Sequence, residues 1–130
     1  MNGEQNAIVA KSWLEKAESA LQDARLLFEN KRLASCVNRL YYAAFYGASA
    51  VLASRGESYG RHSAVRSAVH RDFVNTGLLS TEFGRIYDIL LSRREQSDYQ
   101  PTAKFELDEV AEYLDKSIAM VEALKKIFAG

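Results

Sequence analysis

The chain has 130 residues with a formal net charge of zero at pH 7, and it contains one proline, one cysteine and seven glycines. A chain of this length fits a single domain, and so little proline and glycine excludes a β architecture with many turns. No run approaches the roughly 20 apolar residues of a membrane span, and no secretory signal pattern is visible. We therefore predict one all-α domain over residues 1–130, without a membrane anchor and located in the cytoplasm, where Cys36 stays a reduced, buried thiol.

The neutral total hides an uneven distribution of charge. Residues 32–94 carry nine arginines, no lysine and four acidic side chains, a net charge of +5, whereas residues 95–130 carry a net charge of −4. Arginine presents a planar fork of donors that suits phosphate and base recognition. Two interpretations remain open: the middle of the chain binds a phosphate-bearing ligand, or its arginines pair internally with the acidic C-terminal helix.

Apolar residues recur at spacings of three and four in five stretches, which predicts five helices. Gly77 stands where a left-handed C-terminal cap belongs, Ser80 or Thr81 can cap the following helix, and Pro101 ends it. The segment 55–60 has two glycines and no periodicity, which indicates the longest loop. We predict an up-and-down bundle of four long helices plus one short helix, with these approximate ranges: 7–29, 33–54, 63–75, 81–98 and 105–128.

The second predicted helix is apolar nearly all round, which places it at the centre of the bundle. Arg39, Tyr42 and Tyr46 stand at i, i+3 and i+7 and so share one side of it. A cation there needs Asp98, Glu95 or a bound anion as its partner. Tyr41, Phe45 and Tyr46 are also explained by packing alone, with the tyrosine hydroxyl groups reaching the rim.

The fourth predicted helix ends in Arg93, Arg94, Asp98 and Tyr99. Arg94 and Asp98 face each other at i, i+4, a spacing that an ordinary surface ion pair also explains. Two adjacent guanidinium groups exceed what such a pair needs, which favours an anion site.

His62 follows the loop and precedes a helix, so its imidazole either lies near a bound anion or simply caps the helix. We expect His70 at the surface.

Cysteine and histidine are too sparse for a metal centre, and no phosphate-binding glycine loop is present. We therefore predict neither a metal nor a cofactor.

Four motifs in order resemble the HEPN domain family (higher eukaryotes and prokaryotes nucleotide-binding), and within it the small stand-alone prokaryotic group with an Arg-x-x-x-Asp-Tyr signature. The motifs are Asn38-Arg39-Leu-Tyr41-Tyr42-Ala-Ala-Phe45-Tyr46, His62-Ser63, Phe73-Val-Asn-Thr-Gly77-Leu78 and Arg94-Glu-Gln-Ser-Asp98-Tyr99. The resemblance implies a helical bundle that is frequently a homodimer, often paired with a minimal nucleotidyltransferase in a toxin–antitoxin-like system.

Many members of the family are metal-independent RNases that use arginine and, four to six residues later, histidine. This chain has Asp98 where that histidine is expected, and an ordinary carboxyl group donates a proton poorly at pH 7. In a sibling group with an Arg-to-His-x-Tyr motif, the partner transferase adenylylates the tyrosine of that motif. Here Tyr99 directly follows Asp98, so it lies one residue nearer to the position of the motif histidine.

Three functions follow as hypotheses. The first is a nucleotide- or RNA-binding module whose site includes Arg39, Tyr42, Arg93, Arg94 and Tyr99. The second is an RNase toxin in which Arg94 stabilises the phosphate while Asp98 or His62 handles protons. The third is a purely structural role, in which Arg39, Arg94, Asp98 and Tyr99 form one buried polar network that fixes the helices or the dimer.

Overall fold

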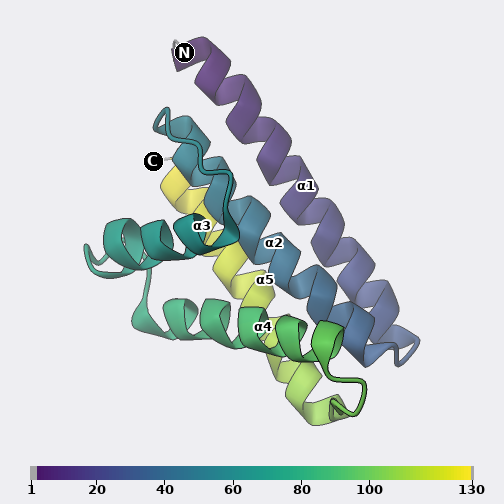
Figure 1. Cartoon of the computed structure of the whole chain (residues 1–130). Helices are drawn as coiled ribbons and strands as arrows, with labels where there is room; N and C mark the ends of the chain where they lie inside the picture. The colour runs from purple at the N-terminus through teal and green to yellow at the C-terminus, as the bar shows by residue number, and fades with distance from the viewer. Residues whose placement is uncertain (1–2, 130) are drawn as a thin grey trace.

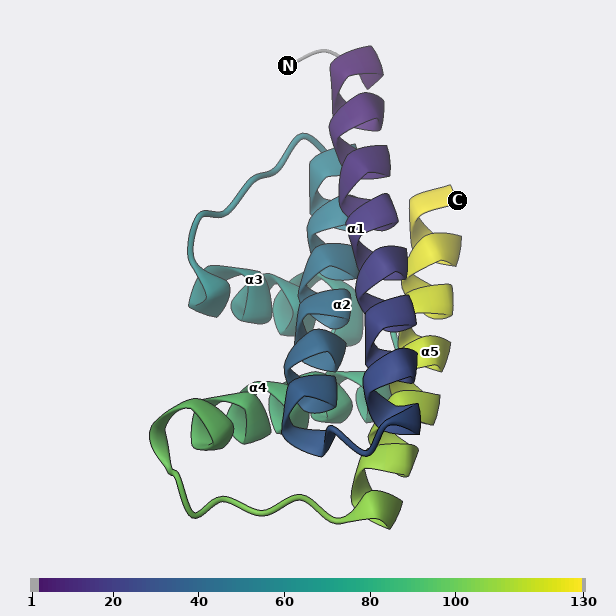
Figure 2. The ribbon, with the colours of Figure 1, turned by 90° about the vertical axis from the view of Figure 1, so that its right-hand side faces the viewer.

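The fold, taken from a computed structural model, is described over residues 3–129. Helices α1, α2 and α5 run side by side, while α3 and α4 lie across them (Figures 1 and 2). The all-α class, with four long helices and a short one, is confirmed, and no strand occurs within the described range. The elements are α1 (Gly3–Glu29), α2 (Leu33–Ser54), α3 (His62–Ala68), the π-helix η1 (Val69–Val74), α4 (Thr81–Tyr99) and α5 (Leu107–Ala129).

Helix α2 is the centre of the molecule, as its apolar composition predicts. Between Cys36 and Ala53 all its residues are buried except five, which repeat at helical spacing and share one side of the helix. We call this partly exposed stripe the α2 ridge: it consists of Asn38, Arg39, Tyr42, Tyr46 and Ser49. In Figure 2, α2 has α1 on one side and α3 and α4 on the other.

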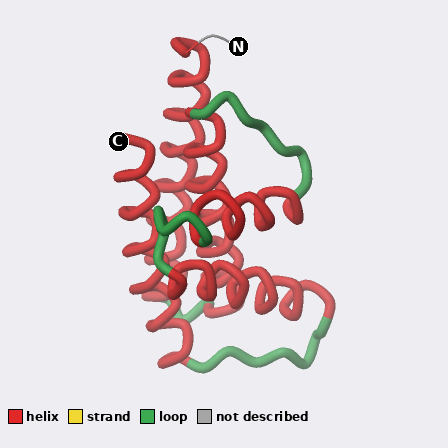
Figure 3. Tube along the Cα trace, turned by 90° about the vertical axis from the view of Figure 1, so that its left-hand side faces the viewer, coloured by secondary structure: helices red, strands yellow, loops and turns green. Residues whose placement is uncertain are grey.

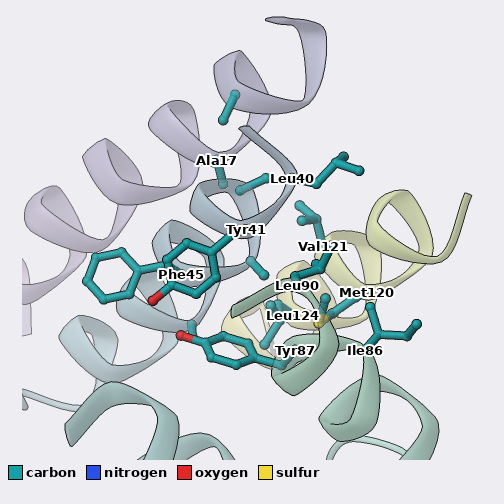
Figure 4. Close-up of a cluster of buried hydrophobic side chains, with 14 of the residues drawn as sticks. Ala17, Leu40, Tyr41, Phe45, Ile86, Tyr87, Leu90, Met120, Val121 and Leu124 are labelled. Atoms are coloured by element: carbon teal, nitrogen blue, oxygen red, sulfur yellow. The ribbon is translucent and has the colours of Figure 1, made fainter. Parts of the chain in front are cut away.

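The core forms where α2 meets α1, α4 and α5. Tyr41 and Tyr87 bring their rings together there, with centroids 5.9 Å apart (Figure 4). A glycine lets α2 approach α5 closely, since a Cβ atom at Gly47 would lie 3.0 Å from Leu124 Cδ1. The buried side chains shown in the same figure include Ala17, Leu40, Phe45, Ile86, Leu90, Met120 and Val121. No helix among residues 3–129 has the length and apolarity that crossing a bilayer requires.

The predicted helix 63–75 is in fact two helical types in succession. Helix α3 gives way to η1, in which the hydrogen bond from Asn75 N to His70 O spans five residues at 2.8 Å. The next boundary is as predicted: Gly77 has φ 83°, and the Ser80 hydroxyl accepts a 3.4 Å hydrogen bond from Phe83 N.

Two boundaries differ by more than one residue from their predicted positions: α1 begins at residue 3 rather than 7, and α5 at residue 107 rather than 105. The two long loops, 55–61 and 100–106, stand at opposite ends of the fold in Figure 3.

Candidate functional site

Arg94 reaches from α4 onto the α2 ridge. Its Nη1 donates a 2.9 Å hydrogen bond to the Tyr42 hydroxyl, and its guanidinium carbon lies 5.1 Å from the ring centroid of Tyr41 and 5.5 Å from that of Tyr42. The side chain is only 15% exposed, and Nε lies 3.6 Å from an Asp98 carboxylate oxygen, which is too long for a hydrogen bond. Within the described residues, a guanidinium with five N–H donors therefore makes one short hydrogen bond.

His62 joins this cluster from the first turn of α3. Its Nδ1 lies 2.9 Å from the Tyr41 hydroxyl, and its ring stacks on Phe45 with centroids 4.2 Å apart. Nε2 has no hydrogen-bond partner among residues 3–129, so it is available to a ligand. Burial and then the nearby Arg94 charge lower the pKa of His62 below its usual 6.5, so the ring is neutral at pH 7.

The Tyr41 hydroxyl that holds His62 does not ionise near neutral pH. Burial raises the pKa of Tyr41 to about 12, although the Arg94 charge acts in the opposite direction. Tyr41 therefore orients the imidazole as a neutral hydrogen-bonding group. The predicted role of Tyr41 was packing, and its contact with His62, 21 residues away, is a feature that the sequence did not indicate.

Arg39 and Asp98 line a shallow hollow beside this cluster, of roughly 270 Å³, together with Leu27, Ala34, Ser35, Asn38 and Ser97. Arg39 lies over the Tyr42 ring at 5.0 Å and donates two hydrogen bonds to Asn38 Oδ1, at 3.2 and 3.0 Å. No carboxylate within the described range lies in ion-pair distance of Arg39. Its charge therefore faces the hollow without an acidic partner.

Arg93 is directed away from the cluster, toward the connection between α4 and α5. Its guanidinium donates to Lys104 O at 2.6 Å, lies 3.0 Å from a Glu109 carboxylate oxygen and covers the Phe105 ring at 4.2 Å. This contact with α5 fits the second interpretation of the charge distribution, internal pairing, for this one arginine. Arg93 thus does not converge with Arg39 and Arg94.

Tyr99 and Asp98 do not belong to a buried network. Tyr99 is 79% exposed at the end of α4, and the Asp98 side chain is 43% exposed. Because Arg39 also has no carboxylate partner, the four side chains named in the structural hypothesis do not form the single buried network that it requires.

A second polar cluster lies on another side of α4. Asp88 accepts two hydrogen bonds from Arg66, at 2.7 and 3.0 Å, and lies 3.0 Å from His70 Nε2. Burial acts to raise the pKa of Asp88, but the contacts with Arg66 and His70 lower it overall. His70 is thus a partly buried member of an ion-pair cluster and not the surface residue that we expected. Nowhere in residues 3–129 do three or more potential metal ligands gather.

Comparison with known proteins identifies relatives of this chain in sequence and in structure. A "UPF0332 protein" of Thermotoga maritima is 38% identical over 119 residues, which cover 92% of this chain and 90% of that protein. A "Putative toxin" of Methanocaldococcus jannaschii is 33% identical over 113 residues, which cover 87% and 84% respectively. A crystal structure from Thermus thermophilus superposes with a TM-score of 0.75 at 16% identity, covering 91% of this chain and 97% of the other, and shares the fold.

The family itself is shown by a match to the sequence model of the HEPN domain over residues 10–127. That range contains the whole α2 ridge, His62, Arg94 and Asp98. The chain belongs to the HEPN domain family.

Proposed function

We propose that this HEPN domain is the nucleotide- or RNA-binding component of a toxin–antitoxin-like pair in the cytoplasm. The observation that carries the proposal is the placement of Arg94, whose guanidinium lies over Tyr41 and Tyr42 and makes one short hydrogen bond. A largely buried cation with unused donors is stabilised by an anion that accepts from it. Phosphate is the anion that matches a guanidinium fork.

The aromatic surroundings favour a nucleotide over a simple anion. Tyr42 is partly exposed beside Arg94, and His62 presents Nε2 in the same cluster. Aromatic side chains beside arginine can stack a base while the guanidinium contacts the phosphate. Neutral His62 adds a hydrogen-bonding group that does not repel the Arg94 charge.

The proposed biological setting comes from the family resemblance and from the relatives. Two Methanocaldococcus jannaschii relatives carry the name "Putative toxin". We extend the proposal to a homodimer and to a minimal nucleotidyltransferase as the second component of the pair. Light scattering of the purified protein tests the dimer, and co-purification with the product of an adjacent transferase gene tests the partner; a monomer and no complex would contradict this extension.

Ligand titration tests the binding site itself. We expect ATP and a short single-stranded RNA to bind at low salt. Arg94→Gln should weaken RNA binding by roughly 10- to 100-fold, because a charged hydrogen bond is worth about 1.5 to 3 kcal/mol. Arg85→Gln is the matched control, since Arg85 is an exposed arginine on the same helix. Equal affinities of the two variants, or no binding by the unsubstituted protein, would overturn the proposal.

A metal-independent RNase is the second candidate, and the position of His62 favours it. The chain lacks the motif histidine at position 98, but His62 brings an imidazole to the Arg94 cluster from another helix. In this reaction neutral His62 accepts the proton of a ribose 2′-hydroxyl while the 2′-oxygen attacks the phosphorus. The 5′-oxygen leaves and takes a proton from water, Arg94 stabilises the charged phosphate, and a cyclic phosphate remains.

Incubation with total RNA in the presence of a chelator separates the two candidates. Cleavage that leaves cyclic phosphate ends and disappears in His62→Ala and in Arg94→Gln would establish the RNase. Binding without such cleavage would leave the first candidate alone.

A further inference from the structure

The Arg94 cluster is one part of a longer stripe of aromatic and cationic side chains. From Tyr42 the α2 ridge continues to Tyr46, whose ring centroid is 5.7 Å away. Tyr46 stacks on Trp13 of α1 at another 5.7 Å, with the ring planes 28° apart. Two such steps therefore connect the Arg94 site to α1.

Cations accompany these rings on α1 as they do at the Arg94 site. Lys16 Nζ lies 4.8 Å from the Tyr46 centroid and 5.4 Å from the Trp13 centroid. Lys16 is exposed, and neither it nor Arg39 has a carboxylate within ion-pair distance among residues 3–129. By contrast, Lys116 and Lys125 each pair with two glutamates. The positive charges of Lys16 and Arg39, at the two ends of this row of rings, are thus left free for a ligand.

A hollow lies at each end of the stripe. Arg39 and Asp98 line one, as described above, and the other is lined by Trp13, Ser49 and Glu57 among others. Glu57 accepts a 3.0 Å hydrogen bond from Tyr59, and its carboxylate places negative charge at this far end. Asp98 places negative charge in the first hollow in the same way, so the ligand-attracting stretch lies between the two carboxylates, from Arg39 to Trp13.

We propose that the α2 ridge, with Trp13 and Lys16 as an additional binding subsite, holds a single-stranded RNA of several nucleotides. This inference rests on the proposed function, because it extends the ligand from the Arg94 site. A partly exposed row of rings with cations at both ends matches the way single strands bind, with bases on aromatic faces and phosphates on cations. A duplex keeps its bases stacked inside and offers no free ring face to Trp13 or Tyr46.

Trp13 supplies a direct reporter because it is the sole tryptophan of the chain. We expect a single-stranded RNA of about eight nucleotides, within the usual site size of such grooves, to change the tryptophan fluorescence. AMP should bind at the Arg94 cluster without that change. A duplex of the same sequence should bind more weakly than the single strand at equal salt.

Lys16→Ala tests the subsite by affinity, with Lys11→Ala as the matched control. Lys11 is an exposed lysine of the same helix, five positions earlier and so about 140° away around it. Lys16→Ala should weaken binding of the single strand about fivefold and reduce the slope of log affinity against log salt by about 0.7. AMP binding should stay unchanged in both variants.

The outcomes distinguish failure of this inference from failure of the proposed function. One combination of results would leave the Arg94 site intact and contradict the Trp13–Lys16 subsite. In it, Arg94→Gln weakens RNA binding, but Trp13 fluorescence does not respond to RNA and Lys16→Ala behaves like Lys11→Ala. Tighter binding of the duplex than of the single strand, or a change in Trp13 fluorescence with AMP alone, would also overturn this inference. If Arg94→Gln has no effect on any ligand, the proposed function fails and this inference with it.

Discussion

Arg93 and Arg94 are neighbours in sequence, and the structure predicts opposite consequences for replacing them. Arg93→Gln removes the ion pair with Glu109, the hydrogen bond to Lys104 O and the contact with the Phe105 ring. The two charged side chains are 20% and 26% exposed, so solvent screens their interaction only in part. The substitution should therefore destabilise the fold without touching the ligand site.

The expected loss follows from the number of contacts and their burial. A hydrogen bond to a charged group contributes about 1.5 to 3 kcal/mol, and Glu109 keeps a 2.6 Å hydrogen bond from Tyr113 after the substitution. We expect Arg93→Gln to lower the free energy of unfolding by about 2 to 3 kcal/mol, which is a decrease in Tm of roughly 6 to 12 °C for a domain of this size. Arg94→Gln loses one hydrogen bond of this kind, to Tyr42, and should cost about 1.5 kcal/mol, the lower end of the same range.

Thermal unfolding followed by circular dichroism, together with RNA titration of the folded variants, measures both effects. Glu109→Gln should reproduce part of the Arg93→Gln loss, and the double variant should lose less than the two single losses combined. An unchanged Tm in Arg93→Gln would refute the reasoning. So would a loss of RNA affinity in Arg93→Gln, while it is still folded, as large as that in Arg94→Gln.

Two further predictions concern groups whose pKa is shifted. Because burial and then Arg94 lower the pKa of His62 in the folded state, the folded protein binds fewer protons than the unfolded chain just below pH 6.5. Stability should therefore fall as the pH drops from 7.5 to about 5.5, and denaturant titrations should show a smaller decrease in His62→Gln; an equal decrease would contradict the assignment. Burial raises the pKa of Cys36 to about 11, so a thiol reagent at pH 8 should label it only after unfolding. Rapid labelling of the native protein would show that the thiol is accessible.

The existence of the helices could be predicted, because it depends on the local periodicity of apolar residues. The range 33–54 for α2 is confirmed as predicted, since its ends coincide with the ends of the apolar pattern. The start of α5 was not predicted correctly, because it depends on tertiary contacts. The Phe105 ring packs under Arg93, and Glu109 accepts a 3.2 Å hydrogen bond from Glu106 N just ahead of the helix. The division between α3 and η1 carries no signal in residue spacing, because the buried residues Val65, Ala68, Val69 and Phe73 keep the spacing of an ordinary α-helix across it.

The candidate site was predictable only in part. Residue types indicated Arg94, Asp98, Arg39 and Tyr42, but not which of the two adjacent arginines turns toward α2. A register argument does not separate them, because Arg94 continues the buried positions Tyr87 and Leu90 at i+7 and i+4, and Arg93 continues Ile86 and Leu90 at i+7 and i+3. The contacts of Tyr41 with His62 and of Tyr46 with Trp13 join segments distant in sequence, and a single sequence does not show such pairs.

The α2 ridge divides one helix into positions of two kinds. The buried residues of α2 determine whether the chain accumulates in the cell at all, whereas the polar ridge residues Asn38, Arg39 and Ser49 contribute little to the core. A saturation mutagenesis library scored separately for cellular abundance and for biological activity would therefore divide along this helix with a period of three to four residues. Substitutions on the ridge would yield abundant but inactive protein, which is the material needed to capture bound ligands or partners without the consequences of activity.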